Sequence, residues 1–184
     1  MNNKTKKMVG IGLFCAIVLV LQYIFGNITV GGTSINPVLV PVVVGAAMYG
    51  WQAGALLGLV SGIAILTITP PQLFLGWNIA GTILTVLVKG TVSGLVAGLA
   101  YHLIRKHSNF WAVVAAAVLC PLVNTGIFVA GCYIFFLPGI ATLTQGDAFT
   151  FIMTVFVGIN IFVELGINVV LAPTIARLIK VGKK

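Results

Sequence analysis

Acidic residues are nearly absent from this chain of 184 residues, which contains only Asp147 and Glu164. A hydrolytic site that needs two carboxylates is therefore nearly excluded. The sequence also lacks the phosphate-binding pattern G-x-x-x-x-G-K-S/T, a His, Cys, Asp and Glu cluster with metal-site spacing, and a histidine at the depth of a candidate nucleophile. We expect a protein that is not an enzyme and that uses no cofactor and no metal.

Charge of either sign is scarce, because only 7% of the residues are charged and 60% are hydrophobic. A soluble domain carries about 25% charged residues, so this chain cannot coat a water-soluble globule, and we expect its solvent to be lipid. The formal net charge of +8 does not indicate nucleic-acid binding, since the cations form no continuous stripe.

Cysteine is rare as well. The three cysteines, Cys15, Cys120 and Cys132, all fall inside apolar segments and have no metal-type spacing. They are interpreted as small packing residues, and a disulfide framework is not expected.

The cations that are present gather in three places beside long apolar stretches. The clusters are Lys4, Lys6 and Lys7; Arg105 and Lys106; and Arg177, Lys180, Lys183 and Lys184. Basic segments of multi-pass proteins stay in the cytoplasm. This pattern predicts a protein of the cell membrane with both termini in the cytoplasm.

The apolar stretches predict an all-α membrane protein. We expect one integral-membrane domain over 1–184, a bundle of six transmembrane helices at about 8–25, 37–49, 51–68, 79–104, 110–136 and 149–179. The first stretch lacks a clear cleavage site and is interpreted as a retained helix. The second is shorter than the ~20 residues of a full crossing, so it is either tilted and extended by its flanks or partly re-entrant. Six crossings place every clustered cation on one side, whereas five would not.

This topology leaves three outer loops, 26–36, 69–78 and 137–148, which contain no Lys or Arg. Their Gly, Asn, Thr, Ser, Gln and Trp residues suit a lid over an outward-facing pocket. Translocated loops are also generally poor in cations, so both interpretations stand.

Glycines repeat every four residues in two consecutive segments, at Gly50, Gly54, Gly58 and Gly62 and then at Gly90, Gly94 and Gly98. Such a spacing lines one helix face and permits close backbone approach in lipid, so we expect the third and fourth segments to pack tightly. The first segment has a similar small face at Gly12, Cys15 and Ala16. That face serves either internal packing or the docking of another membrane protein.

Two ionisable residues are expected near mid-membrane. Lys89 lies about 15 Å and Glu164 about 22 Å along their helices from the outer end, at 1.5 Å per residue. A charge at this depth costs at least about 2.5–3.5 kcal/mol, so both side chains should face the bundle interior. Either they pair with each other, or Lys89 meets an anionic ligand group while Glu164 holds it in place.

Amides and a tryptophan accompany these charges. Asn160, Glu164 and Asn168 follow one another at four-residue steps, Asn124 follows Pro121, and Trp77 and Asn78 precede the fourth segment. Convergence of these groups on one cavity would bind a small polar metabolite. Amides also join helices through hydrogen bonds, which we favour for Asn168.

The chain resembles a known family, the membrane-embedded substrate-binding subunits (S-components) of energy-coupling factor (ECF) vitamin transporters. The resemblance rests on GIGLFCAIVLVLQYIF, on INPVLVPVVVGAAMYGWQAGALLGLVSGI and on VKGTVSGLVAGLAYHLIRK, and it covers nearly the whole chain. It implies a six-helix bundle that binds a vitamin near its outer face. It also implies a transmembrane scaffold subunit and two cytosolic ATPases as partners. The family's alanine-rich scaffold-binding motif is matched here by Gly12, Cys15 and Ala16, which are small but not all alanine.

The segments CPLVNTGIF and GINIFVELGINVVLAP look most like pantothenate-type members. A riboflavin-type member would be expected to show an Asn and Lys pair in the sixth helix, where this chain has Asn160 and Glu164. We expect Trp77, Asn78, Lys89, Asn124, Asn160 and Glu164 to bind the substrate. The resemblance favours pantothenate over riboflavin or another water-soluble vitamin as that substrate.

Two other functions stay open. A self-sufficient channel or secondary transporter would use Lys89 and Glu164 as an ion relay, and its uptake would collapse with the ion gradient. A purely structural membrane protein would show a thermal stability that no vitamin changes.

Overall fold

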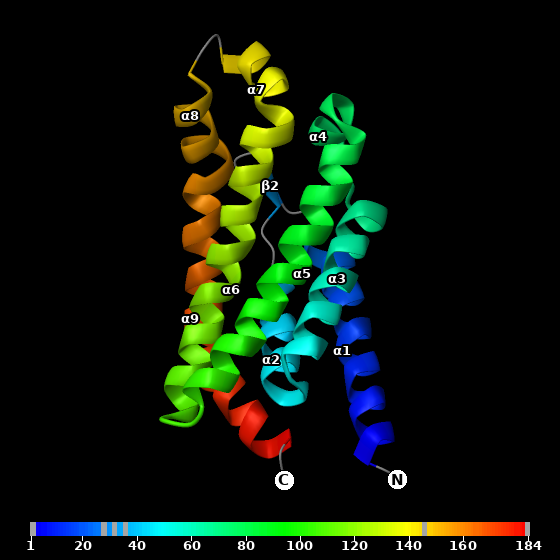
Figure 1. Cartoon of the computed structure of the whole chain (residues 1–184), viewed down its shortest axis with the longest axis vertical. Helices are drawn as coiled ribbons and strands as arrows, with labels where there is room; N and C mark the ends of the chain where they lie inside the picture. The colour runs from blue at the N-terminus through cyan, green and yellow to red at the C-terminus, as the bar shows by residue number, and fades with distance from the viewer. Residues whose placement is uncertain (1–2, 27–28, 31–32, 35–36, 145–146, 183–184) are drawn as a thin grey trace.

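A computed structural model describes the backbone of residues 3–26, 29–30, 33–34, 37–144 and 147–182. Side chains are described over the same ranges except at 3, 29, 30, 33, 34, 156, 159, 160, 178 and 180–182. The described part of the chain is almost entirely helical and forms an elongated bundle (Figure 1).

The first half of the chain holds α1 (Asn3–Phe25), a short antiparallel hairpin of β1 (Thr29–Val30) and β2 (Thr33–Ser34), α2 (Leu39–Tyr49), α3 (Trp51–Ile68) and α4 (Gln72–Trp77). The second half holds α5 (Ile79–Ile104), α6 (Asn109–Gly131), the π-helical segment η1 (Cys132–Phe136), α7 (Leu137–Thr144), α8 (Ala148–Phe151), the π-helical segment η2 (Ile152–Gly158) and α9 (Ile159–Gly182). The start of α1 and the end of α9 lie at the same end of the bundle (Figure 1).

Within the described residues, four helices are long and apolar enough to cross a membrane. They cover Lys4–Phe25, Trp51–Ile68, Ile79–Ile104 and Asn109–Thr144, and α2 is a shorter apolar helix. Large apolar side chains are exposed along their outer faces, as expected where lipid replaces water as the solvent. The architecture is that of a helical, multi-pass membrane protein.

The three expected outer loops contain more structure than the sequence indicated. The first holds the β1–β2 hairpin, the second holds α4, and most of the third is the helix α7. Pro70 and Pro71 do end α3, but proline is compatible with a helix start, and α4 begins directly after Pro71. Before Pro138, the π-helical turn η1 has a wider ring of hydrogen bonds. We attribute the continuation of the helix into α7 to this turn, because it separates the proline ring from the preceding carbonyl.

The glycine faces of α3 and α5 pack backbone against backbone, as the four-residue spacing predicted. A Cβ added to Gly54 would collide with the Gly94 carbonyl oxygen, and one added to Gly58 would collide with that of Gly90. At Gly62 the added atom would lie 3.0 Å from the Val86 carbonyl oxygen. Gly50 is a correction to the predicted stripe. It lies between α2 and α3 with φ +100°, and an added Cβ there would meet nothing within 4 Å, so its role is to allow the turn.

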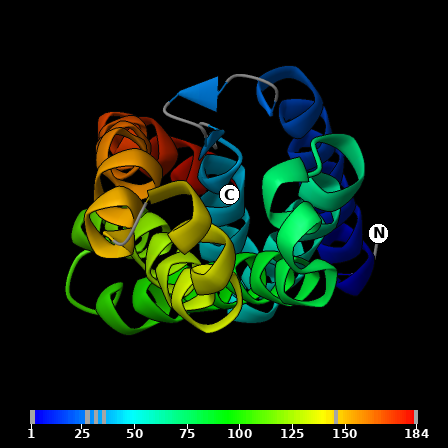
Figure 2. The same cartoon turned by 90° about the horizontal axis from the view of Figure 1, so that it is seen from above.

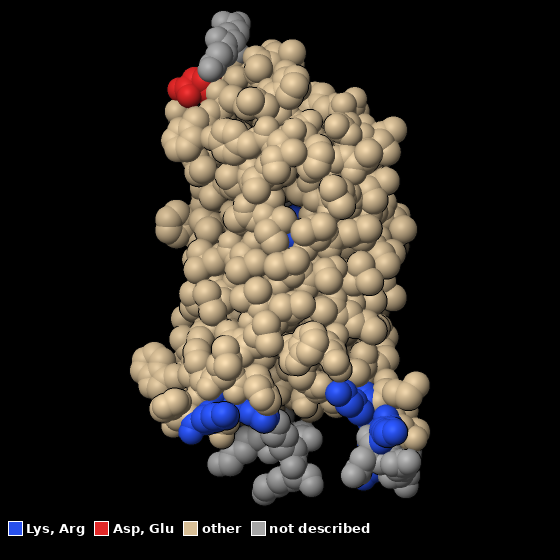
Figure 3. All heavy atoms as spheres, in the orientation of Figure 1, with Lys and Arg blue, Asp and Glu red and all other residues tan. Residues whose placement is uncertain are grey.

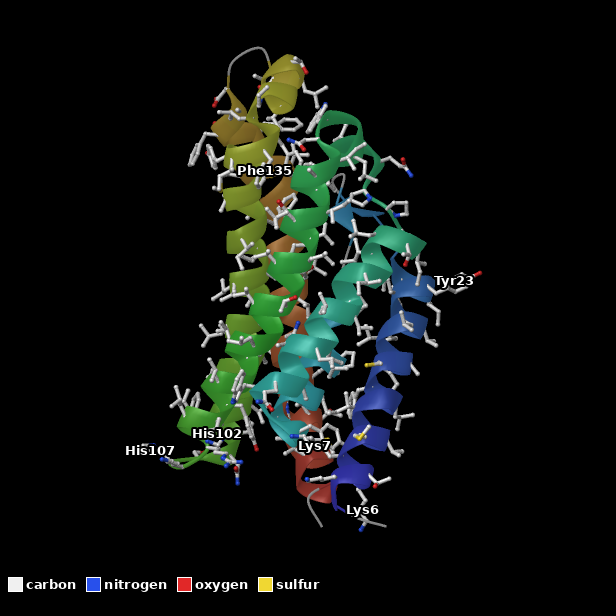
Figure 4. The ribbon with its side chains drawn as sticks, turned by 45° about the vertical axis from the view of Figure 1, so that its right-hand side comes forward. Lys6, Lys7, Tyr23, His102, His107 and Phe135 are labelled. Carbon is white, nitrogen blue, oxygen red and sulfur yellow. The ribbon has the colours of Figure 1, made fainter. Side chains whose placement is uncertain are left out.

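The helix α1 lies at one side of the bundle, and α8 and α9 lie at the other (Figure 2). It contacts α2 and α3 through a narrow strip in which Val18 is fully buried. Phe14, Cys15 and Leu21 are partly buried beside it. Most of the other apolar residues of α1 are exposed, and Tyr23 points away from the bundle (Figure 4). The polar Gln22 is nevertheless buried, and its Nε2 donates to the Thr69 hydroxyl of α3 at 2.7 Å.

Two apolar clusters occupy the interior at different heights. One combines α2, α5, α6 and α9 around Tyr101, Val113 and Ile175. The other combines α4, η1, α7 and η2 around Phe74, Phe136 and Ile152. The polar groups of α5, α6 and α9 described next lie along the chain between the residues of these two clusters.

Candidate functional site

Helix α5 carries a polar stripe on the side opposite to lipid. Its members follow one another at steps of three or four residues and are Asn78, Thr82, Thr85, Lys89 and Ser93. The three hydroxyl residues are between 0% and 5% exposed. The Thr82 hydroxyl donates to the Asn78 carbonyl oxygen at 2.8 Å and the Ser93 hydroxyl to the Gly90 carbonyl oxygen at 2.9 Å. The Thr85 hydroxyl has no hydrogen-bond partner among the described residues.

Helix α6 and the start of η1 present a second row with four-residue steps, formed by Cys120, Asn124, Phe128 and Cys132. Asn124 is 5% exposed, and both cysteines are fully buried. The row faces the α5 stripe at several points. Cys120 lies beside Ser93, and an added Cβ at Gly131 would be 2.6 Å from the Thr85 hydroxyl oxygen.

Lys89 is the charged member of the α5 stripe. Its Nζ lies 5.2 Å from the centroid of the Phe128 ring, a cation–π contact. Glu164 of α9, which is 5% exposed, attracts it electrostatically. A charge at mid-membrane costs at least about 2.5–3.5 kcal/mol, and a desolvated cation–π contact returns about 2 kcal/mol. The ring alone therefore does not stabilise the ammonium, and the attraction of Glu164 is needed as well.

Helix α9 contributes Glu164 and Asn168 to the same interior. Asn168 is fully buried, and its Nδ2 donates to the Glu164 carbonyl oxygen one turn earlier at 2.8 Å. Its Oδ1 accepts no hydrogen bond from the described residues. The expected helix-joining role of Asn168 is thus not visible in this bond, which stays within α9. The side chain of Asn160, the first member of the predicted α9 row, lies outside the described residues.

Asn78 has a local structural role. It is the N-cap of α5, where its Oδ1 accepts a hydrogen bond from the Gly81 backbone N–H at 2.8 Å. This geometry satisfies one of the orphan donors at the start of the helix. The side-chain amide is half-buried, and its Nδ2 is not used by the cap.

Trp77 belongs to an aromatic cluster above the polar residues. Phe74 of α4 is at its centre, with ring centroids 5.6 Å from Trp77, 5.5 Å from Phe128 and 5.0 Å from Phe136. The Trp77 ring also covers Gly139 of α7, where an added Cβ would collide with the ring. Through Phe128 the aromatic cluster is continuous with the Lys89 ammonium.

Both π-helical segments contribute to this aromatic region. Cys132 and Phe136 come from η1 and Ile152 comes from η2, and all three are buried around Phe74. A π-helical turn is rare and is frequently found at functional sites, where it shifts side chains out of the regular α-helical register. The two such turns here mark the same part of the molecule.

The structure brings together only some of the residues that the sequence suggested for substrate binding. Glu164 attracts Lys89 electrostatically, and Asn124 lies one turn from Phe128 on α6. Asn78, the N-cap of α5, lies about 17 Å along the helix from Lys89, at 1.5 Å per residue. Trp77 is the last residue of α4. The sequence reasoning did not identify Thr82, Thr85, Ser93, Phe74 or Phe128. The three- and four-residue steps that connect Thr82, Thr85, Lys89 and Ser93 on α5 could have identified the three hydroxyl residues. The glycine repeat of the same segment was the only pattern that was interpreted there.

The small-residue face of α1 is not used within the bundle. Gly12 and Ala16 are exposed, and an added Cβ at Gly12 would meet nothing within 4 Å. Cys15 is half-buried and packs against the α1–α2–α3 cluster.

Comparison with known proteins gives a family for this arrangement. The family model described as "ECF transporter, substrate-specific component" matches residues 6–176. No curated protein and no solved structure matches the chain.

The match includes nearly all of the described helices, from the basic start of α1 to the last turns of α9. It agrees with apolar helices that surround a polar interior. Members of this family bind the substrate in the membrane and work with a scaffold subunit and ATPase subunits. The chain belongs to the family of substrate-specific components of ECF transporters, and it is a substrate-binding membrane subunit rather than an enzyme.

Proposed function

We propose that this chain captures a water-soluble vitamin near the outer face of the cell membrane and delivers it across with a scaffold subunit and two cytosolic ATPases. The observation that carries the proposal is the polar layer between α5, α6 and α9, capped by the aromatic cluster around Phe74. A chain that only needed to pack in lipid would have no use for a buried cation, a carboxylate and several amides. Concave, mostly apolar sites with a few polar groups are typical of small-molecule binding.

The proposed site uses Trp77, Asn78, Lys89, Asn124, Asn160 and Glu164. Trp77 belongs to the aromatic cluster and Asn78 follows it at the start of α5. Lys89, Asn124 and Glu164 belong to the polar layer. Phe74 and Phe128 are added to this set because they connect the two regions. The N-cap bond of Asn78 leaves its Nδ2 for a ligand.

The proposed topology has six crossings with both termini in the cytoplasm. In Figure 3 the Lys and Arg side chains gather at the lower end of the bundle, and an acidic residue lies at the upper end. Lys6, Lys7, His102 and His107 share the lower end in Figure 4, whereas Phe135 lies toward the upper end. The positive-inside rule then assigns the lower end to the cytoplasm and the aromatic cluster to the outside.

The scaffold subunit is proposed to dock on α1 at Gly12, Cys15 and Ala16. Gly12 and Ala16 are exposed and have no internal packing role, which leaves a flat strip for close approach of another helix.

Pantothenate is the favoured vitamin, and riboflavin or another water-soluble vitamin is the alternative. Pantothenate carries a carboxylate, hydroxyls and an amide, which match one cation, several amides and a hydroxyl of the polar layer. The test is mass spectrometry of small molecules that co-purify with the chain, followed by calorimetric titration of the identified vitamin. The proposal fails if no vitamin is found or bound, or if the chain alone drives concentrative uptake into vesicles.

The second candidate is a self-sufficient secondary transporter. The electrostatic contact between Lys89 and Glu164 favours it, because such a pair in a membrane is typical of ion relays. Reconstitution separates the two functions. An ion relay gives uptake that collapses with the ion gradient, whereas a binding subunit gives uptake only with its ATPase partners.

A further inference from the structure

Lys89 is only partly buried, although its neighbours on the same helix face are buried. Thr85 and Ser93, one turn before and one turn after it, are 5% and 0% exposed, whereas Lys89 is half-buried. Figure 3 shows a small blue area recessed among uncharged residues at mid-height of the bundle, far from the basic lower end.

The Thr85 hydroxyl lies one turn from Lys89 on the outer side. Residues four apart on a helix have Cβ atoms about 5–6 Å apart, so both donors can approach one small group. The hydroxyl is buried and has no partner among the described residues. A buried donor without a hydrogen-bond partner lowers the stability of the folded chain. Such a donor is retained where a ligand or a water molecule supplies the missing acceptor.

The contacts of Lys89 leave it able to accept an anion. The Phe128 ring covers one side of the ammonium, with its centroid 5.2 Å from Nζ. Because the ring has no lone pair, this contact uses none of the N–H donors in a conventional hydrogen bond. An ammonium has three donors, so the attraction of Glu164 does not exhaust them.

The chemistry of the surroundings selects among anions. The nearby Glu164 would repel a second negative charge in the low-dielectric interior. The site therefore suits a single negative charge with two oxygen acceptors.

We propose that Lys89 and Thr85 form a carboxylate-binding subsite and that this chain selects carboxylate-bearing solutes over their neutral counterparts. In this arrangement Lys89 is a specificity-determining residue and Phe128 and Glu164 are positioning residues that hold its ammonium. The inference rests on the proposed function, since it names the class of substrate for the same interior.

The test uses the purified full-length chain in lipid nanodiscs and isothermal titration with a panel of vitamins. Pantothenate, biotin and nicotinate carry a carboxylate, whereas riboflavin and pyridoxine do not. For the carboxylate that binds, the matched probe is its analogue with a primary alcohol in place of the carboxylate. We expect the carboxylate form to bind about tenfold tighter or more, the range of a charge-assisted hydrogen bond.

The variant Lys89→Met should weaken binding of the carboxylate form about tenfold or more and leave the alcohol form within about threefold of its wild-type affinity. The control Lys106→Met removes one exposed lysine outside the bundle and should change neither affinity. The double variant Lys89→Met/Glu164→Gln also removes the carboxylate of Glu164, so that no buried acid stays behind without its cation. If the carboxylate form stays weak there, the loss comes from the ligand contact and not from an unpaired Glu164.

Three results would overturn the inference, and they differ in what they say about the proposed function. Binding of riboflavin or pyridoxine but of no carboxylate leaves a vitamin-binding subunit and removes the subsite. Equal weakening of both probe forms, or recovery of the carboxylate form in the double variant, assigns Lys89 to structural pairing. Failure of every vitamin to bind the wild-type chain overturns the proposed function together with the subsite.

Discussion

Helix α5 has two faces that are built in opposite ways. Toward α3 it presents Gly90, Gly94 and Gly98, and the two backbones touch without intervening side chains. Toward α6 and α9 it presents Thr85, Lys89 and Ser93, with polar groups that are only partly satisfied inside the protein. The glycine face is stabilised by van der Waals contact between two backbones, neither of which can change its conformation as a side chain can. The polar face carries hydrogen-bonding groups to which a ligand can supply the missing partner. One rigid helix thus joins a permanent interface to an adaptable one.

The largest effect is expected on the glycine face. In Gly58→Ala the new Cβ would collide with the Gly90 carbonyl oxygen, and two backbones cannot separate as a flexible side chain can. We expect a loss of about 3 kcal/mol in the free energy of unfolding, the upper range for overpacking. Thermal unfolding in nanodiscs measures it.

The matched control for this change is Gly12→Ala, where an added Cβ meets nothing within 4 Å. It should leave the stability of the isolated chain unchanged within about 0.5 kcal/mol. Equal melting temperatures for the two variants would show that the α3–α5 contact is not the rigid interface described above.

A smaller effect is expected for the two amides of α6 and α9 that are proposed to bind the vitamin. The variants Asn124→Ala and Asn160→Ala should each weaken vitamin binding by about 1 kcal/mol or more, because ligand groups lose a hydrogen-bond partner. Titration calorimetry measures the change, with Asn109→Ala at the exposed start of α6 as control. Unchanged affinity in both variants would assign the two amides to helix packing.

The variant Asn78→Ala separates capping from binding. Loss of the bond to the Gly81 N–H should lower the free energy of unfolding by about 1 kcal/mol, since the first turn of α5 loses its cap. Thermal unfolding without ligand measures this effect. The variant Asn78→Ser retains a capping oxygen and should recover most of the stability; if it does not, the cap is not the reason for the loss.

The smallest effect on stability is expected at Thr85. Thr85→Val removes a buried hydroxyl that has no partner among the described residues, and it keeps the shape of the side chain. The unliganded chain should therefore be unchanged or slightly more stable, by no more than about 1 kcal/mol, because no internal hydrogen bond is lost. Chemical unfolding measures the change. A clear loss of stability would mean that the hydroxyl is satisfied within the bundle.

The elements that the sequence predicted well are those set by local periodicity. The expected ranges 51–68 and 79–104 have the same ends as α3 and α5, because Pro70 and the Arg105–Lys106 pair stop the apolar stretches. The four-residue glycine spacing likewise predicted the α3–α5 contact. In each case one short stretch of chain contains all the necessary information.

The missed features depend on neighbours that are distant in the sequence. The short helix α4 is held by contacts of Phe74 with Phe128 and Phe136 of the following helices. The helix α7 contains the pair Pro138–Gly139, which normally indicates a turn, and the π-helical register before it allows the helix to continue. Neither cause can be read from the residues of the loop itself.

The sequence by itself determined that this chain lies in a membrane, that its basic clusters lie just outside long apolar stretches and that two of its helices meet through glycine. These properties follow from composition and from a repeat close to the helical period, which do not depend on the rest of the fold. Only the tertiary structure decided that Lys89 lies over Phe128 and within reach of Glu164, and that the amide of Asn78 caps a helix. Such roles depend on which helices are neighbours and how they are rotated, because a side chain acts on the groups that packing brings within a few ångströms.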